Sequence, residues 1–512
     1  MEKIKNQVKA GAVLSYLQMA LNIIIGLTYT PLMLRYLGQS EYGLYNTVSS
    51  IISMLSILSL GFNSSYIRYY AKYKKEKNEE DIAKLNGLFL IIFVIIGVVG
   101  LLCGTFLSFN LRIVFDKGLT SSEYQIAKVL MLLLTVNLAL SFPMSVFSSI
   151  ISAHEKYIFL KLLGMAKNVL GPLVTMPLLL MGYRSIAMVS VTVSISVIVD
   201  VLYFIYVKFI LKNRFVFHHF EKGLFKSLFV YTSFIAINLI VDQINWNVDK
   251  FLLGRFKGTE VVAVYSVGYS LYQYYMMFST SISSIFTPRI HKIVNNTADN
   301  IPEQKRQLTD IFIKVGRVQF LLLALVASGL VFFGKPFIRF WAGESYGKAY
   351  YVMLLLVLPA SIALIQNVGI EVQRAQNKHQ FRSLVYLVMA IINIVLTIFL
   401  CQKWGAVGAA IGTAISLVIA NGIIMNVYYH KKCNINVLAF WGNILRMCLG
   451  LLIPIAVGVC IVKFINLNSI IMLICGICIY AVVYCLSMYL FGMNKYEQEL
   501  IKKPLRKVLR RK

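Results

Sequence analysis

The chain has 512 residues, of which 58% are hydrophobic and only 14% are charged. This composition excludes an ordinary soluble domain, in which about a quarter of the residues are charged. The net charge of +29 would suggest nucleic-acid binding in a soluble protein. Here the basic residues follow the loop pattern of a membrane protein, so we predict no nucleic-acid partner.

Apolar segments long enough to cross a bilayer recur along the whole chain. A spanning helix needs about 20 apolar residues, because the hydrocarbon core is roughly 30 Å thick. The segments predict an all-α integral membrane protein with about 14 transmembrane helices. We place the spans at 11–34, 43–67, 87–109, 127–151, 158–181, 185–210, 226–248, 261–287, 311–333, 349–371, 384–402, 405–429, 438–462 and 469–491.

Lys and Arg concentrate in every second gap between these spans. About 34 of the 50 basic residues fall on one side and about 13 on the other. Because basic loops remain in the cytoplasm, both termini are predicted to be cytoplasmic. The basic tail 493–512 has two interpretations: it is only an orientation signal, or it also binds anionic membrane lipids.

The sequence carries no motif that predicts a cofactor, a metal site or an enzyme. Seven of the eight cysteines follow residue 400, mostly inside spans, where they behave as small apolar residues. Cys475 and Cys478 form a CxxC pair, but they lie within an apolar helix. There is no phosphate-binding G-x-x-x-x-G-K-[ST] loop and no zinc-type spacing. The basic N-terminus precedes a run of full spanning length, which is unlike a cleaved signal peptide.

Two segments in the first and second halves of the chain resemble each other. Residues 35–45 and 255–265 share an Arg, a Gly three residues later and a Tyr ten residues after the Arg. Six spans per copy give parallel repeats, as in transporters built from two bundles; chance similarity between apolar sequences is the alternative. Further echoes pair Pro143 with Pro359, Asn168 with Asn393, and Gly182 with Gly405. We therefore predict an N-terminal six-helix lobe (1–212), a C-terminal six-helix lobe (213–432), two additional helices (433–492) and a basic tail (493–512).

Polar side chains inside the first-half spans are candidates for a binding site. Gln18 and Asn22 lie one helical turn apart, and Arg68 ends the second span. Lys167 lies about nine residues into its span, roughly 14 Å at 1.5 Å per residue. That depth is too great for simple snorkelling to the interface, whereas Arg317 lies near enough to a span end to reach it.

A polar stripe runs along the seventh span. Asn238, Asp242, Asn245 and Asp249 are spaced 4, 3 and 4 residues apart, which predicts that they share one helical face. Such a stripe either lines a cavity or joins helices through hydrogen bonds. A carboxylate in hydrocarbon is costly, so Asp242 should face protein or a wet cavity; Asp249 is near enough to the surface to be solvated.

The tenth and eighth spans carry two further candidate groups. Gln366 precedes Glu371 and Arg374, whose spacing also permits an internal ion pair. In the eighth span Tyr265, Tyr269 and Tyr272 recur at helical spacing. Their rings would either stack on sugars in a wet groove or form an aromatic belt at the membrane surface.

Local motifs resemble those of a known transporter family. The segment 35–45, followed by Leu60-Gly61-Phe62 and Arg68-Tyr69-Tyr70, is similar to the start of polysaccharide flippases, as is the segment 249–265. This group belongs to the multidrug/oligosaccharidyl-lipid/polysaccharide exporter superfamily. The resemblance implies two six-helix lobes around a central cavity, with two helices appended. It also implies a secondary transporter that exports a lipid-linked oligosaccharide across the bacterial cytoplasmic membrane for cell-surface polysaccharide synthesis.

The polar residues suit a cargo with a pyrophosphate, a sugar head and a lipid tail. We assign the cationic residues Lys167, Arg68 and Arg317 to the pyrophosphate, and Arg374 to the same substrate site. Amides would bind the sugar, and carboxylates would couple transport to protons or sodium. The amides are Asn22, Asn238, Asn245 and Gln366, and the carboxylates are Asp242, Asp249 and Glu371.

Other functions stay open at this point. A cation-coupled multidrug exporter would share the architecture, and a flippase for a peptidoglycan precursor or a teichoic-type polymer would share the chemistry. A polymerase or ligase would need a large outer loop with catalytic residues, which the sequence lacks. The expected partners are the lipid-linked substrate, anionic lipids and, for this pathway class, polysaccharide polymerase and chain-length proteins.

Overall fold

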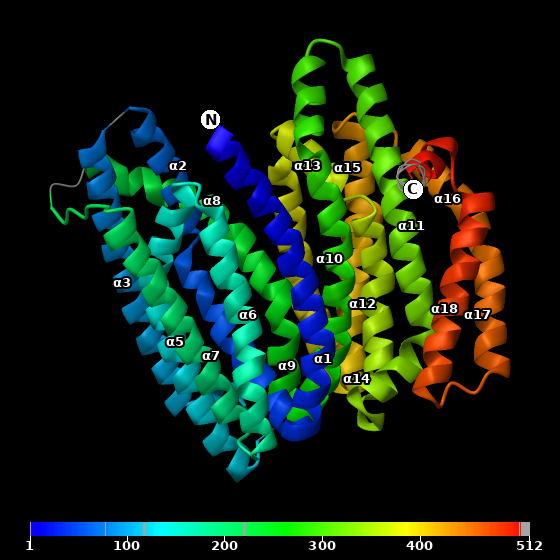
Figure 1. Cartoon of the computed structure of the whole chain (residues 1–512), viewed down its shortest axis with the longest axis horizontal. Helices are drawn as coiled ribbons and strands as arrows, with labels where there is room; N and C mark the ends of the chain where they lie inside the picture. The colour runs from blue at the N-terminus through cyan, green and yellow to red at the C-terminus, as the bar shows by residue number, and fades with distance from the viewer. Residues whose placement is uncertain (1, 77, 116–118, 219–221, 501, 503–512) are drawn as a thin grey trace, which may run out of the picture. The chain divides into compact units, whose positions relative to one another are not determined.

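The computed structural model describes residues 2–76, 78–115, 119–218, 222–500 and 502. Every regular element in these ranges is helical (Figure 1), which confirms the predicted all-α fold class. Nine of the described helices are long and apolar enough to cross a membrane, or ten when one bent pair counts as a single span. The chain is therefore a multi-pass membrane protein, and the count of fourteen spans stays a prediction.

Two of the nine candidate helices are too long to be single spans. Val13–Lys75 and His379–Lys432 contain 63 and 54 residues. At 1.5 Å per residue they would measure about 95 and 80 Å, far more than a bilayer core of about 30 Å. Each contains a glycine with non-helical dihedral angles, Gly38 and Gly405 respectively. Each of these long runs is therefore broken at a glycine into shorter segments.

The helices form two compact units. The first unit comprises Met1–Ser266 and Thr397–Ala409. Within it, α3 packs on α5, α5 on α7, and α1 on α6. The predicted lobes 1–212 and 213–432 are divided at other residues and stay predictions. The elements of the first unit are α1 (Glu2–Leu55), η1 (Ser56–Ser59), α2 (Phe62–Lys75), α3 (Glu79–Phe109), α4 (Leu111–Val114), α5 (Ser121–Ala153), α6 (Tyr157–Leu180), α7 (Ser185–Ile205), η2 (Tyr206–Ile210), α8 (Lys222–Gln243), η3 (Ile244–Val248), α9 (Asp249–Lys257) and the start of α10 (Thr259–Asn296).

The second unit comprises Val267–Leu396 and Ala410–Lys512. The long helix α11 lies at its centre and packs against α12, α16 and α18, and α17 and α18 run side by side (Figure 1). Besides the rest of α10, its elements are α11 (Ile301–Ala342), η4 (Glu344–Tyr346), α12 (Ala349–Leu364), α13 (Val368–Ala375), most of α14 (His379–Leu417), η5 (Val418–Ile424), α15 (Met425–Lys432), α16 (Val437–Cys448), η6 (Leu449–Leu451), α17 (Leu452–Phe464), α18 (Ile470–Ser487) and η7 (Met488–Gly492).

Buried aromatic side chains hold part of the first unit together. Phe62 of α2 meets Phe89 and Phe93 of α3 in edge-to-face contacts with ring centroids 6.2 and 6.3 Å apart. Such contacts add to the energy of burial itself. Tyr66 is completely buried, and its hydroxyl donates to Asn86 Oδ1 at 2.6 Å. The first-unit polar residues described below therefore belong to a unit with a well-packed core.

The structure gives the two similar segments a common backbone feature. Gly38 and Gly258 have φ angles of 77° and 85° and ψ angles of 171° and 176°. A positive φ favours glycine, because a side chain would clash with the backbone. Both glycines interrupt helical chain in the same way, between the halves of α1 and between α9 and α10. An internal repeat predicts this agreement at these positions.

Candidate functional site

The predicted site residues are divided between the two units. Seven lie in the first unit, and Arg317, Gln366, Glu371 and Arg374 lie in the second. Arg68 is exposed on α2, and Asn238 and Asp242 are exposed on α8. Each unit therefore has its own set of polar side chains, and the two sets are considered separately.

A group of polar residues, the first-unit polar cluster, lies where α1, α6 and α7 pack together. Asn168 of α6 donates from Nδ2 to Oδ1 of Asn22 on α1, over 2.8 Å. Gln18, one turn earlier on α1, lies over Gly164 of α6, where an added Cβ would be 3.1 Å from its amide nitrogen. Each of these polar side chains is half-buried. The members of the cluster are Gln18, Asn22, Lys167, Asn168 and Asp200.

Lys167 is the cation of this cluster, and Asp200 of α7 is a carboxylate that interacts with it electrostatically. No hydrogen bond or ion pair joins Lys167 to the described residues, so its ammonium keeps its donors for another group. The sequence reasoning missed Asp200. A single carboxylate in the apolar run 185–205 is the signal that could have identified it, since such residues are costly in a membrane.

This cluster combines the chemistry that a phosphate-bearing sugar requires. The Lys167 ammonium provides three donors and a positive charge for phosphate oxygens, and the amides of Gln18 and Asn22 can both donate and accept. Hydrogen bonds to charged groups are stronger than those between neutral groups. The cluster can therefore bind an anion and a polar head together.

The predicted stripe of the seventh span does not stay on one face. Asn238 and Asp242 are exposed and Asn245 is half-buried, but Asp249 is only 4% exposed. The reason is the π-helical turn η3 at Ile244–Val248. A π turn inserts one residue and rotates everything that follows it, so Asp249 faces the inside of the unit. The suggestion that Asp249 is solvated is wrong.

Asp249 is held by hydroxyl groups from two other segments. Tyr265 donates to its Oδ2 at 2.5 Å, and Thr397 donates to its Oδ1 at 3.1 Å. Tyr265, Tyr269 and Tyr272 are all buried, at 9% exposure or less. They therefore form neither a wet sugar-stacking surface nor an exposed aromatic belt, and Tyr265 instead fixes a buried carboxylate.

Arg317 has a buried partner that its sequence position did not reveal. Its Nε donates to Glu497 Oε1 at 2.6 Å, and its Nη2 donates to Oε2 at 2.9 Å. The guanidinium also donates to the carbonyl of Gly492 at 2.9 Å. The two side chains are 6% and 2% exposed. This bidentate pair joins α11 to the C-terminal segment and leaves the guanidinium little access to a ligand.

The second unit contains a network of amides and hydroxyls around the break between α12 and α13. These helices meet at an angle of 45°. Ser279 of α10 is the shared partner: Gln319 Nε2 and Asn367 Nδ2 both donate to its Oγ, at 3.2 and 2.9 Å. Gln366 lies in the same break and is 2% exposed. The network stabilises a bent helix in the interior of the unit.

The predicted internal pair in α13 is present. Arg374 Nη1 lies 2.7 Å from Glu371 Oε1. Elsewhere in the unit, the guanidinium of Arg382 lies 4.6 Å from the ring centroid of Tyr386, a contact that the sequence reasoning missed. The Tyr386 hydroxyl accepts from Arg382 at 2.9 Å and donates to Asn421 Oδ1 at 2.5 Å. The Arg-x-x-x-Tyr spacing at the start of an apolar run was the available signal.

His154 follows α5 in a turn outside the spanning segments. Its Nδ1 donates to the Ile150 carbonyl at 2.9 Å, and its Nε2 shares a hydrogen bond with the Tyr70 hydroxyl at 3.0 Å. Burial lowers the pKa of His154 below its usual value, and the nearby positive charges of Lys74 and Lys156 lower it further.

We expect this turn to lose stability on acidification. The folded state favours neutral His154, so its contribution is complete above the unfolded pKa of about 6.5 and is lost as the pH falls through the lower folded value. The melting temperature of the purified protein in detergent, measured between pH 7.5 and 5.0, tests this. His154→Gln should show a smaller fall than the wild type, and an equal fall would contradict the assignment.

The apolar spanning helices, with polar side chains packed between them, define a multi-pass membrane protein. Residues 8–294 match the family described as "Polysaccharide biosynthesis protein". The match covers more than half of the sequence, and the chain belongs to this family.

Three known proteins are similar to the chain. A protein of Shigella flexneri named "Putative O-antigen transporter" is 22% identical over 219 residues, which is 42% of this chain and 50% of that protein. The chain thus matches about half the length of this curated relative. The structure of the lipid II flippase MurJ, in an inward closed conformation, has a TM-score of 0.71 at 17% identity, covering 96% of this chain and 99% of the other. An inward-facing multidrug resistance MATE family transporter has a TM-score of 0.64 at 11% identity, covering 84% and 99%. At these identities the structural matches show the shared fold.

Proposed function

We propose that this protein is a secondary transporter that moves a polyprenyl-pyrophosphate-linked oligosaccharide from the inner to the outer leaflet by alternating access. Family membership supports a role in polysaccharide synthesis. The first-unit polar cluster is the observation that supports this particular substrate. Lys167 forms no hydrogen bond or ion pair with the described residues, and it adjoins in sequence Asn168, which bonds to Asn22 between α6 and α1; this combination suits a phosphate joined to a sugar.

We assign Lys167 to the pyrophosphate, with Arg68 of α2 as a further cationic contact in the same unit; Arg374 of α13 is left out, because it pairs with Glu371. The amides contact the sugar. Arg317 is left out of this assignment, because Glu497 already pairs with its guanidinium. The proposed sugar-binding residues are Asn22, Asn238 and Asn245, whereas Gln366 is left out because it is 2% exposed.

The membrane potential can drive this export without another ion. One charge that crosses 100 mV gains about 2.3 kcal/mol. Two negative charges leaving a negative interior therefore gain roughly 4–5 kcal/mol. Coupling to protons or sodium is the alternative, and the carboxylates Asp242, Asp249 and Glu371 are its candidates. Transport that persisted after both the potential and the ion gradients were collapsed would contradict both schemes.

The proposed location is the bacterial cytoplasmic membrane, with both termini in the cytoplasm. The distribution of Lys and Arg between alternate loops supports this orientation. The proposed partners are the lipid-linked oligosaccharide, anionic membrane lipids, and polysaccharide polymerase and chain-length proteins. We propose no cofactor and no enzymatic activity.

Deletion of the gene in its native host tests the proposal. We expect a complete lipid-linked repeat unit to accumulate on the cytoplasmic leaflet, as measured by mass spectrometry of extracted polyprenyl-linked oligosaccharides. The wild-type gene should reverse the accumulation. An unchanged lipid-linked pool, together with normal surface polysaccharide, would contradict the proposal.

A cation-coupled multidrug exporter is the second candidate. The fold is also similar to that of a MATE family transporter, and the carboxylates Asp200 and Asp249 lie inside the first unit. A deletion strain that gained sensitivity to cationic dyes, without any change in lipid-linked oligosaccharide, would favour this function.

A further inference from the structure

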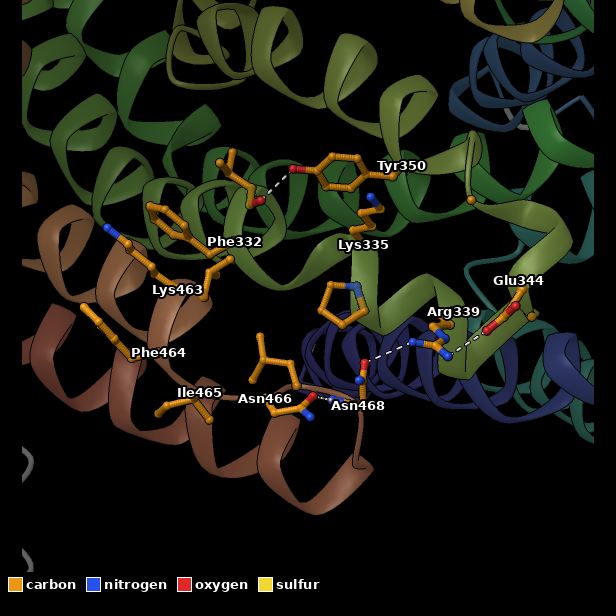
Figure 2. Close-up of a pocket in the computed structure, with 16 residues that line it drawn as sticks. Phe332, Lys335, Arg339, Glu344, Tyr350, Lys463, Phe464, Ile465, Asn466 and Asn468 are labelled. Carbon is orange, nitrogen blue, oxygen red and sulfur yellow. Dashed lines mark hydrogen bonds and ion pairs between the residues drawn. The ribbon is translucent and has the colours of Figure 1, made fainter.

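A cavity of about 910 Å³ lies in the second unit, at the C-terminal end of α11. It is bounded by α11, the segment that leads into α12, and the turn between α17 and α18 (Figure 2). The volume falls in the range of small-molecule sites, about 300–1,000 Å³. The predicted and assigned substrate residues do not line this cavity, so it is independent of the proposed transport site.

The lining is cationic. Lys335, Arg339 and Lys463 contribute positive charge, and Glu344 is the carboxylate among the lining residues. The predicted orientation puts this end of α11 on the outer side, where loops carry few basic residues. Three basic side chains at one outer-side cavity differ from the rest of the chain, in which Lys and Arg concentrate in the predicted cytoplasmic loops. A ligand with negative charge would explain this difference.

Hydrogen bonds fix the rim of the cavity but leave the two lysines available. Arg339 donates from Nη1 to Asn468 Oδ1 at 3.0 Å, and its Nη2 lies 2.7 Å from Glu344 Oε1. Figure 2 shows the guanidinium between these two partners. Arg339 therefore ties α11 to both neighbouring turns. Lys335 and Lys463 are exposed and form no ion pair with the described part of the chain.

The wall of the cavity is amphipathic. Tyr350 is fixed by a hydrogen bond of 2.6 Å from its hydroxyl to the Val331 carbonyl, and Phe332 also lines the cavity. Among the lining residues, Phe464 is 77% exposed and Val462 is 47% exposed. Ile470, the first residue of α18, is 56% exposed. In a spanning bundle such side chains contact acyl chains. A ligand here meets cations on one side and lipid on the other.

We propose that this cavity, the α11–α17 pocket, binds the phosphate of an anionic lipid headgroup at the end of α11. Lys335 and Lys463 contact the phosphate, Arg339 holds the rim in shape, and the acyl chains lie along the exposed apolar side chains of α17 and α18. A bilayer phospholipid and a polyprenyl phosphate carry the same group, and the experiment below distinguishes these two sources.

The test measures lipid binding to the purified full-length protein by native mass spectrometry. The probes are phosphatidylglycerol, zwitterionic phosphatidylcholine and undecaprenyl phosphate, each added at the same concentration. The wild type should retain an anionic lipid at least about five-fold more than phosphatidylcholine, since each lysine near a charged surface contributes about that factor. Lys335→Gln and Lys463→Gln should each reduce the preference about five-fold. Stronger binding of phosphatidylglycerol identifies a bilayer lipid as the source, and stronger binding of undecaprenyl phosphate identifies the carrier.

Lys348→Gln is the matched control, because Lys348 is an exposed lysine at the same end of the unit that does not line the pocket. Lys335→Arg and Lys463→Arg should preserve the lipid preference. Equal losses in Lys348→Gln would show a diffuse charge effect and overturn the pocket assignment. Equal retention of phosphatidylcholine, or displacement of lipid by inorganic phosphate, would overturn the assignment to an anionic lipid. None of these results depends on transport activity, so the proposed function can fail or succeed separately.

Discussion

Replacing Glu497 with alanine is expected to destabilise the folded protein by about 3–5 kcal/mol, the usual cost of breaking a buried ion pair by removing one partner. Glu497 accepts two hydrogen bonds from Arg317 and is 2% exposed. Among the described residues, its removal leaves the buried guanidinium with the backbone carbonyls of Asn443 and Gly492 as partners. Thermal unfolding of the purified protein in detergent should report the loss as a large fall in melting temperature.

Two further variants show whether the loss comes from the pair itself. Glu499→Ala removes an exposed carboxylate two residues along the same segment and should change stability by less than about 0.5 kcal/mol. The double variant Arg317→Met with Glu497→Leu removes both charges and should recover much of the stability, because buried ion pairs can often be replaced by apolar residues. If Glu497→Ala unfolded at the wild-type temperature, the pair would have no structural role.

Lys167→Ala is expected to reduce export of the lipid-linked oligosaccharide about 10- to 100-fold at equal protein level. A hydrogen bond to a charged group contributes about 1.5–3 kcal/mol, and each 1.4 kcal/mol is a factor of ten. Export is measured as the fall in accumulated lipid-linked repeat units after the variant is expressed in the deletion strain. Lys161→Ala, near the start of the same helix, is the matched control and should export normally.

The partner of Lys167 allows a stricter test. If Lys167 only neutralises Asp200, then the double variant Lys167→Ala with Asp200→Ala should regain export. If Lys167 contacts the pyrophosphate, the double variant should stay as inactive as Lys167→Ala. Recovery in the double variant would contradict the substrate assignment and leave the Lys167–Asp200 interaction as a structural one.

The helical membrane fold could be predicted because its cause is local. A run of about 20 apolar residues must form a helix in a bilayer, since no water is present to satisfy its backbone. The breaks at Gly38 and Gly405 could also be predicted, because both glycines belong to the repeated features of the sequence. The bend between α12 and α13 could not be predicted, since neither proline nor glycine occurs at residues 365–367 and tertiary contacts to Ser279 hold it.

Candidate site residues could be predicted where a polar or charged side chain lies within an apolar span, because its burial in the membrane is energetically costly. They could not be predicted where the partner side chain lies far away in the sequence. Lys167 and Asn22 stand out as polar residues at membrane depth. The partner of Arg317 lies 180 residues away, and no spacing rule joins the two positions. The π turn at Ile244–Val248 has no clear sequence signal, so the helical wheel of an ideal α-helix put Asp249 on the wrong face.

The matched glycines Gly38 and Gly258 bear on the ancestry of the chain. Side chains diverge freely wherever several residues fit, but a backbone turn with positive φ accepts little besides glycine. Two halves that descend from one duplicated gene would therefore keep this turn long after their other residues had drifted apart. The dihedral angles of these two residues agree within 8° in φ and 5° in ψ, as a duplication of this kind predicts.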